Sequence, residues 1–210
     1  MDCMDYMREQ PDKSFDLAIC DPNYGIKQDG RNNHSRSELA IAKDYSSNSR
    51  YDEKPPEKEY FQELIRVSKN QIIWGGNHLA DLIGKSSPCW IVWDKENGDN
   101  DFSDCELAYT SFETAVRIFR FRWQGMLQGN MKNKEIRIHP NQKPMALYNW
   151  ILRNYAEPGQ RIIDTHGGSF NSAISAHYFG VDFVGIEIDE DYYNAACERF
   201  NNETRQIALI

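Results

Sequence analysis

Two short segments of the chain carry residue types and spacings suited to chemistry on an amino group. Asp21-Pro22-Asn23-Tyr24 follows an apolar run near the start, and a second segment with two adjacent glycines follows another apolar run far along the chain. An exocyclic amino group on a nucleobase is a poor nucleophile, because its lone pair is delocalised into the ring. A carboxylate and a main-chain carbonyl that accept its two N–H bonds would localise that lone pair in the transition state. A neighbouring aromatic ring would hold the planar base by stacking, which contributes about 1–3 kcal/mol per base.

The glycine-containing segment, residues 164–169 (DTHGGS), has the character of a ligand-binding turn. Paired glycines let the backbone approach a ligand closely, and N–H groups at the start of a helix favour a negative group. Glu187 lies 187 − 164 = 23 residues after Asp164, a spacing that allows an acidic side chain to accept hydrogen bonds from ribose hydroxyls. The chain contains neither G-x-G-x-x-G nor G-x-x-x-x-G-K-[ST], which disfavours dehydrogenases and P-loop enzymes.

Each segment also has a plainer interpretation. The glycines would then serve only the packing of a turn, with Glu187 as a solvated strand end, since short glycine patterns are weak motifs. Asp21 would cap an ordinary proline turn. These alternatives stay open as long as each segment is considered alone.

Apolar runs of strand type alternate with amphipathic stretches, and these elements must position the two segments. The pattern predicts strands over Phe15–Cys20, 70–74, 89–93, 105–112, 115–121, Arg161–Asp164 and 183–188. It predicts helices over 57–68, 78–83, 144–155, Asn171–Phe179 and 191–201. Residues 27–56 are polar with little periodicity, which is typical of a functional lid or a disordered loop. The expected fold is α/β, Rossmann-like and doubly wound, with a mostly parallel sheet and helices on both faces.

Composition restricts the class of protein. A chain of 210 residues with 40% hydrophobic and 27% charged residues fits one domain with a sizeable core. No run approaches the ~20 apolar residues of a membrane span, and the first ten residues lack the features of a secretory signal. Five cysteines without a C-x-x-C pair argue against a disulfide framework and a zinc site. We therefore expect one cytoplasmic domain over residues 1–210, with no metal and no membrane contact.

The net charge of −8 by itself disfavours nucleic acid as a partner, but the charge is unevenly distributed. Between residues 114 and 143 there are seven basic residues and one acidic residue, so this stretch carries 7 − 1 = +6. The basic residues are Arg117, Arg120, Arg122, Lys132, Lys134, Arg137 and Lys143. They would neutralise phosphates, and the alternative is a solvated strand face. Lys27, Arg31 and Arg36 form a second candidate surface in the polar segment.

Four motifs in one order resemble those of S-adenosylmethionine-dependent DNA amino-methyltransferases. Residues 21–24 are similar to the D-P-P-Y motif, with Asn23 in place of the second proline. Residues 139–144 (HPNQKP) are similar to the H-P-x-Q-K-P segment, 164–169 to the D-x-x-x-G-S cofactor loop, and 185–189 (GIEID) to the G-x-E-I-D strand end. The catalytic motif precedes the cofactor loop, which is the circularly permuted order of the β group. The resemblance covers nearly the whole chain.

The resemblance implies a role for each matching residue. Asp21 would accept from the target amino group through its side chain and Pro22 through its carbonyl, while Tyr24 would stack on an extruded base. Lys143 would lie near the carboxylate of the cofactor, and Glu187 would hold its ribose. The other implied cofactor-binding residues are Asp164, Thr165, His166, Gly167, Gly168, Ser169 and Asp189. D-P-P-Y is associated with N6-adenine and S-P-P-Y with N4-cytosine, so the resemblance points to adenine in double-stranded DNA.

The same resemblance divides the chain into a catalytic half (1–112), a DNA-recognition segment (113–138) and a cofactor-binding half (139–210). Competing expectations are N4-cytosine methylation and a catalytically inactive DNA-binding descendant. The second is motivated by Phe170, which stands where the family loop ends in glycine; a bulky side chain is strained there if φ is positive. The recognised DNA site, a homodimer and a partner restriction endonuclease are left open. Every role requires that the aspartate turn and the glycine turn line one pocket.

Overall fold

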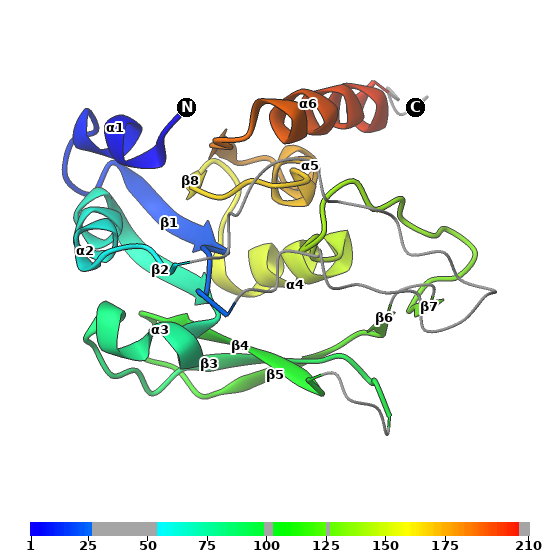
Figure 1. Cartoon of the computed structure of the whole chain (residues 1–210), viewed down its shortest axis with the longest axis horizontal. Coiled ribbons are helices and arrows are strands. Elements are labelled where there is room, and N and C mark those ends of the chain that lie inside the picture. The colour runs from blue at the N-terminus through cyan, green and yellow to red at the C-terminus, as the bar shows by residue number, and fades with distance from the viewer. Residues whose placement is uncertain (27–53, 99–102, 125–126, 206–210) are drawn as a thin grey trace.

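The computed structural model describes residues 1–26, 54–98, 103–124 and 127–205. Most of the expected polar segment, with Lys27, Arg31 and Arg36, therefore lies outside the described residues. Among the described residues, one sheet of seven strands has the order β5-β3-β4-β2-β1-β8-β9, and β6 and β7 form a separate pair (Figure 1). No helix in this part of the chain has the length and apolar character needed to cross a bilayer.

The strands and helices have the following bounds. The strands are β1 (Phe15–Cys20), β2 (Ser68–Trp74), β3 (Trp90–Asp94), β4 (Cys105–Thr110), β5 (Arg117–Arg120), β6 (Trp123–Gln124), β7 (Leu127–Gln128), β8 (Arg161–Asp164) and β9 (Asp182–Gly185). The helices are α1 (Cys3–Arg8), α2 (Lys58–Val67), α3 (Gly76–Ile83), α4 (Met145–Tyr155), α5 (Asn171–Phe179) and α6 (Glu190–Thr204).

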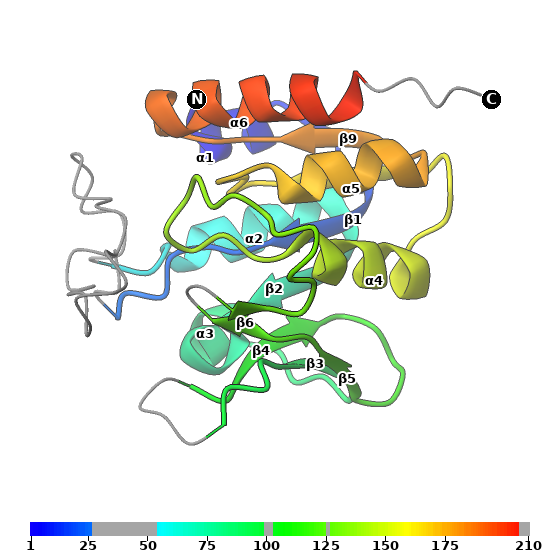
Figure 2. The same cartoon turned by 90° about the vertical axis from the view of Figure 1, so that its right-hand side faces the viewer.

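The sheet is mostly parallel, as the sequence predicts. β1 pairs in parallel with β2 and with β8, β8 with β9, and β3 with β5, whereas β4 runs antiparallel to both of its neighbours. Helices cover both faces: α1, α2 and α3 pack on one side, and α4 and α5 on the other (Figure 2). The α/β, Rossmann-like, doubly wound fold is confirmed.

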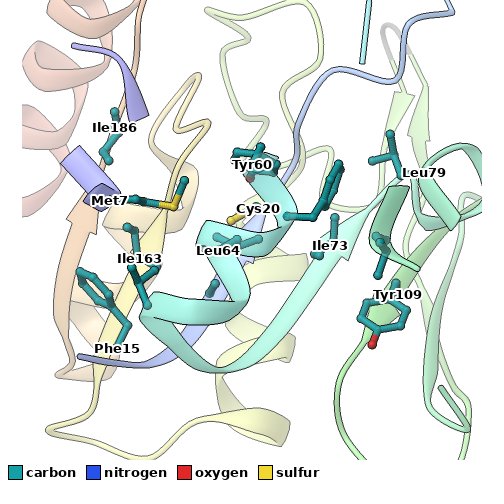
Figure 3. Packing of buried hydrophobic residues seen from close by; sticks show 14 residues of the cluster. Met7, Phe15, Cys20, Tyr60, Leu64, Ile73, Leu79, Tyr109, Ile163 and Ile186 are labelled. Carbon is teal, nitrogen blue, oxygen red and sulfur yellow. The ribbon is translucent and has the colours of Figure 1, made fainter. Parts of the chain in front are cut away.

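Side chains of the inner strands alternate between the two faces of the sheet, because successive residues of a strand point in opposite directions. On the face covered by α2, Tyr60 and Leu64 pack against Cys20, Ile73 and other strand residues (Figure 3). On the opposite face, strand residues meet helix α4; this cluster includes Leu17, Ile19, Ile72, Trp74, Leu147 and Ile151. Five of the six residues of β1 are apolar, as a strand with two buried faces requires; the exception, Asp16, is half-buried and pairs with Lys69.

Several predicted boundaries need correction. The predicted strand 183–188 is wrong beyond Gly185. The N–H of Ile186 makes the last bond to β8, at Asp164, and the Ile186 carbonyl then accepts from Gly167 in the adjoining turn. The predicted strands 105–112 and 115–121 shorten to β4 and β5. Helix α1 and the β6–β7 pair were not predicted, since six-residue and two-residue elements carry too little periodicity.

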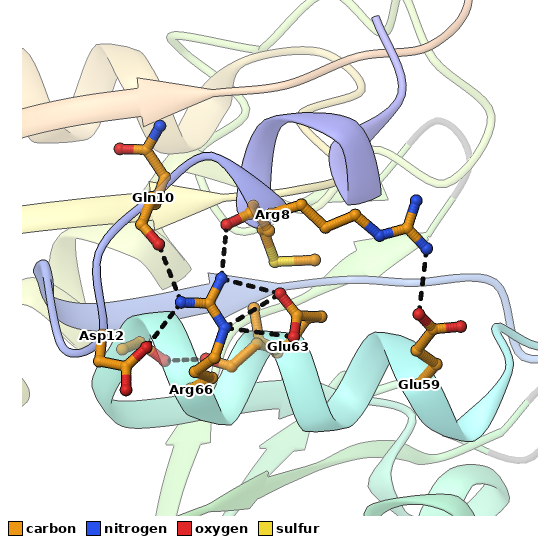
Figure 4. A network of polar contacts seen from close by, with 9 residues as sticks. Arg8, Gln10, Asp12, Glu59, Glu63 and Arg66 are labelled. Atoms are coloured by element: carbon orange, nitrogen blue, oxygen red, sulfur yellow. Dashed lines mark hydrogen bonds and ion pairs between the residues drawn. The ribbon is translucent and has the colours of Figure 1, made fainter.

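Helix α1 is joined to α2 by an arginine-centred network (Figure 4). The Arg66 guanidinium of α2 donates to the carbonyls of Met7 and Gln10, and also to the carboxylates of Asp12 and Glu63. Its planar set of N–H groups suits several acceptors at once. The two main-chain acceptors lie at and just after the end of α1, where carbonyl groups have fewer partners within the helix, and Met7 O also accepts from the N–H of Gln10.

Phe170 begins helix α5 in the left-handed region, with φ 55° and ψ 29°. The residue is 6% exposed and packs with Ala173 and Ala196, between α5 and α6. A methyl group added at Gly167 would lie 2.0 Å from the Phe170 ring, so the glycine makes room for the phenyl group. The condition under which the sequence predicts strain at this bulky residue, a positive φ, is therefore met.

We expect Phe170→Gly to lower the free energy of unfolding by about 1–4 kcal/mol. Loss of a buried ring costs about 3–5 kcal/mol, and relief of the left-handed strain returns about 1–2 kcal/mol. Phe170→Ala keeps the strain while losing the ring, so it should destabilise the protein more than glycine does. Urea unfolding of both variants measures the order, and equal or greater destabilisation by glycine would contradict the strain at this position.

Candidate active site

A cavity of about 620 Å³ lies beyond the carboxyl ends of β1 and β8, where ligands bind in open α/β sheets. Its lining includes Asp21, Pro22, Asn23 and Tyr24 from the first turn, and Thr165, His166, Gly167, Gly168 and Ser169 from the second. Lys143, Glu187 and Asp189 also line it. The two turns are adjacent because β1 and β8 pair in parallel, with Leu17 opposite Ile162 and Ala18 opposite Ile163. The predicted shared pocket is confirmed.

Asp21 is held from two sides within the cavity wall. Its Oδ1 accepts from the hydroxyl of Tyr24 at 2.5 Å, and its Oδ2 accepts from Lys143 Nζ at 2.6 Å. Lys143 Nζ is also 3.0 Å from Glu106 Oε2. Burial raises the pKa of Asp21 above its usual range, while the Lys143 charge acts in the opposite direction. In this structure the Lys143 ammonium, for which the resemblance implies a position near the cofactor carboxylate, forms ion pairs with Asp21 and Glu106.

The ring of Tyr24 rests on a glycine. Gly75 precedes α3 with φ 69°, and a methyl group there would lie 2.2 Å from a Tyr24 ring atom. His78 of α3 stacks with Tyr24 at a centroid distance of 5.5 Å and an interplanar angle of 19°. Gly75, just before α3, and His78, within its first turn, therefore set the plane of the tyrosine ring.

A buried polar cluster ties the two turns to α2. The hydroxyl of Tyr60 is 2.7 Å from Thr165 Oγ1, which is 3.3 Å from Cys20 Sγ and 2.9 Å from His166 Nδ1. Burial raises the pKa of Cys20 to about 12 and lowers that of His166 to about 4. Near neutral pH this cluster is therefore uncharged, and it fixes Thr165 against the end of β1.

The glycine turn is shaped by two acidic side chains. Glu187 accepts from the N–H groups of Gly168 at 2.8 Å and Asp189 at 2.9 Å, which leaves further lone pairs on its carboxylate. Asp164 lies beneath the turn, is 1% exposed, and accepts from the N–H of His166 and the hydroxyl of Ser172. Burial raises the pKa of Asp164 to about 7. Among the predicted cofactor-binding residues, Asp164 alone is missing from the described lining of the cavity.

The predicted DNA-binding residues fall into two groups. Arg137 lines the cavity and stacks over Trp123, with its guanidinium carbon 4.6 Å from the ring centroid. Five others are exposed and do not line the described cavity: Arg117, Arg120, Arg122, Lys132 and Lys134. The acidic residue of this stretch, Glu135, points inward and accepts from Met145 N–H and Asn171 Nδ2. The outer surface of the segment is therefore basic.

Sequence reasoning missed residues whose importance depends on tertiary contacts. Glu106 and Lys95 line the cavity, and their side chains form an ion pair at 2.5 Å. Gly75 and His78 support Tyr24, and Tyr60 supports Thr165. The charges of Glu106 and Lys95 in otherwise strand-like sequence were an available signal, because an unpaired charge is costly in a half-buried sheet.

Comparison with known proteins gives a consistent result. The DNA methylase family model N6_N4_Mtase matches residues 73–198, more than half of the chain. Type II methyltransferase M2.MboI of Moraxella bovis is 22% identical over 96% of this chain and 86% of that protein. DNA adenine methyltransferase YhdJ of Escherichia coli K12 is 36% identical over 63 residues, which are 30% of this chain and 21% of that protein.

The solved structure of the M1.HpyAVI–SAM complex superposes with a TM-score of 0.61 at 16% identity, covering 96% of each chain. At that identity the superposition concerns the fold alone. The family match includes the strands and turns on the cofactor side of the cavity. It covers more than half of the chain and therefore assigns the family as well as the fold. This chain belongs to the DNA methylase family, the S-adenosylmethionine-dependent DNA methyltransferases that modify amino groups of bases.

Proposed function

We propose that this chain transfers a methyl group from S-adenosylmethionine to the N6 amino group of adenine in double-stranded DNA. The observation that carries the proposal is the shared cavity, in which the aspartate turn after β1 faces the glycine turn after β8. Asp21, which can accept hydrogen bonds from an amino group, therefore lies in the same cavity as the glycine turn, which can bind a nucleoside-like methyl donor. We expect the reaction in the cytoplasm; whether the protein forms a homodimer or has a partner endonuclease stays open.

The residues around the glycine turn fit S-adenosylmethionine in their chemistry. Gly167 and Gly168 present backbone without side chains, and Glu187 keeps acceptor capacity for ribose hydroxyls after binding two N–H groups. The ring of Phe170, which motivated an inactive descendant, packs between α5 and α6, and the described lining of the cavity does not include it. Asp189, Thr165, His166 and Ser169 complete the proposed wall of the cofactor site.

The cofactor supplies an electrophilic methyl group on a sulfonium, which is already a good leaving group. The task of this chain is therefore positioning and hydrogen bonding. Asp21 Oδ1 and Oδ2 and the carbonyl of Pro22 are the proposed acceptors for the amino group, and Tyr24 is the proposed stacking surface for the base. Because a base within a duplex is out of reach, the adenine must be extruded into the cavity.

Adenine is favoured over cytosine by two observations. Asp21 occupies the first position of the motif, where the cytosine-N4 type has serine, and the stretch matching YhdJ is similar to a DNA adenine methyltransferase. The family description covers both N6 and N4 methylation, so N4-cytosine is the second candidate. Arg137 beside the cavity and the exposed basic residues of segment 113–138 are the proposed phosphate contacts.

The deciding experiment is methyl transfer from labelled S-adenosylmethionine to unmethylated genomic DNA, followed by nucleoside analysis. We expect N6-methyl-2′-deoxyadenosine in the digest, and N4-methyl-2′-deoxycytidine alone would instead establish the second candidate. Stabilisation by S-adenosylhomocysteine tests binding separately, since a ligand at 100 times its Kd adds about 2.7 kcal/mol. If neither methyl transfer nor stabilisation by the ligand is observed, the result would favour an inactive DNA-binding protein.

Asp21→Ala and Glu187→Ala should divide the activity into its two parts. Removal of the Asp21 carboxylate should lower the rate of methyl transfer by at least about 100-fold, as loss of a transition-state hydrogen-bond partner does. Its affinity for S-adenosylmethionine, measured by calorimetry, should change little. Glu187→Ala should weaken that affinity about tenfold or more. Near-normal turnover in the first variant, or unchanged cofactor affinity in the second, would reject the corresponding role.

Gly75→Ala should impair methyl transfer through Tyr24. The new methyl group collides with the tyrosine ring, so we expect the rate of transfer to fall about tenfold or more with cofactor affinity nearly unchanged. Gly84→Ala is a matched control at the other end of α3. Its φ of 64° imposes similar left-handed strain, but the nearest atom to its added methyl, the Asp81 carbonyl oxygen, is 3.9 Å away. Equal losses of activity in both variants would mean that backbone strain, and not displacement of the Tyr24 ring, causes the loss.

A further inference from the structure

Four side chains with alternating charge form a continuous chain in the wall of the cavity. Lys95 Nζ is 2.5 Å from Glu106 Oε1, Glu106 Oε2 is 3.0 Å from Lys143 Nζ, and Lys143 Nζ is 2.6 Å from Asp21 Oδ2. Lys143 is the most deeply placed, with 5% of its side chain exposed, and the other three side chains are 15–23% exposed. The four formal charges sum to zero.

The sheet brings these residues together from four separate parts of the chain. Asp21 follows β1 and Lys143 lies two residues before the start of α4, whereas Glu106 lies in β4. Lys95 follows β3, and the antiparallel pairing of β3 with β4 places Trp93 opposite Glu106 at the cavity end of both strands. The main-chain N–H of Lys95 bonds to Asp104 O at 2.9 Å, which holds Lys95 beside Glu106.

We propose that Glu106 is a positioning residue for methyl transfer, acting through Lys143 on Asp21. Its carboxylate shares the Lys143 ammonium with Asp21, and Lys95 balances the charge of Glu106. The ammonium is therefore not concentrated on Asp21, whose oxygens stay strong enough as acceptors to bind an amino group. This inference rests on the proposed function, because it assumes that Asp21 accepts from the target amine.

The pKa shifts of Glu106 and Asp21 agree with this positioning role. Burial would raise the pKa of Glu106, but the ammonium groups of Lys143 and Lys95 outweigh it and hold that pKa at about 2. Burial raises the pKa of Asp21, the Lys143 charge lowers it, and the Glu106 charge raises it again. Groups facing Asp21 are Tyr24 of its own turn, Lys143, Tyr148 of α4, Glu106 of β4 and Asp164 of β8.

Glu106→Gln and Lys95→Gln form a matched pair with opposite expected effects. Without the negative charge of Glu106, Asp21 is the remaining carboxylate paired with the Lys143 ammonium, and the repulsion between the two carboxylates is lost. The pKa of Asp21 should therefore fall by about half a unit to one unit. The acid limb of the pH profile of single-turnover methyl transfer should move to lower pH by the same amount, and the plateau rate should fall about tenfold. Removing the positive charge of Lys95 leaves the negative charge of Glu106 uncompensated, so the pKa of Asp21 should rise and the limb should move to higher pH.

The measurement that separates this inference from the proposed function is ¹³C NMR titration of the Asp21 carboxyl group. It needs no turnover, and Asp21→Asn assigns the signal. Opposite shifts of that pKa in the two variants, with the kinetic limb following, support the positioning role. Unchanged or same-direction shifts overturn it, even where Glu106→Gln lowers the melting temperature, because that would mark a structural role alone. Absence of methyl transfer in the wild-type protein would reject the proposed function and leave the titration to decide the electrostatic chain.

Discussion

Asp21 and Thr165 stand at the ends of two strands that are hydrogen bonded in parallel in the sheet. Parallel strands end at the same edge, so each residue that follows β1 or β8 must lie at one border of the sheet whatever its place in the sequence. The pairing of Ala18 with Ile163 sets how far each turn extends beyond that border. The hydrogen bond between Thr165 and Cys20 then fixes the turns to each other. A cavity with two chemically different walls follows from this register.

Charge balance is the second constraint on the cavity. An ammonium with 5% of its side chain exposed would lose several kcal/mol of hydration free energy if it stood alone. Lys143 is instead flanked by Asp21 and Glu106. Lys95 supplies a second positive charge, so that the two carboxylates and the two ammonium groups together carry no net charge. The arrangement keeps an ionised aspartate in a largely buried position, where its hydrogen bonds are stronger than in water.

Backbone conformation is used in opposite ways at two helix starts. At Gly75 the left-handed conformation occurs without a side chain, and the space is taken by the ring of Tyr24. At Phe170 a bulky residue takes the same conformation, and its ring fills the space left by Gly167. In the first case the glycine serves the cavity, and in the second the pair serves the packing of α5 and α6. A departure from the family loop can therefore be absorbed without a side chain entering the site.

Much of this protein was predictable from local sequence, because its inner strands are short apolar runs and the glycine turn lies between a strand and a helix. Strands β1 and β8, helix α5, the parallel sheet and the two functional turns follow from such patterns. The turn residues that would face a ligand were also identified from their types. By contrast, the end of β9 at Gly185 and the short helix α1 depend on neighbours that periodicity does not report.

Tertiary structure decided which charges meet. The Lys143 ammonium pairs with Asp21 and Glu106, because β4 presents an acidic side chain at the same sheet edge; its position near a cofactor carboxylate stays a prediction. Arg137, alone among the exposed or half-buried basic residues of its segment, reaches the cavity wall over Trp123. Sequence by itself determined the residue types and the strands that carry them. The distances between side chains from separate strands, and hence their electrostatic coupling, exist only after the sheet has assembled.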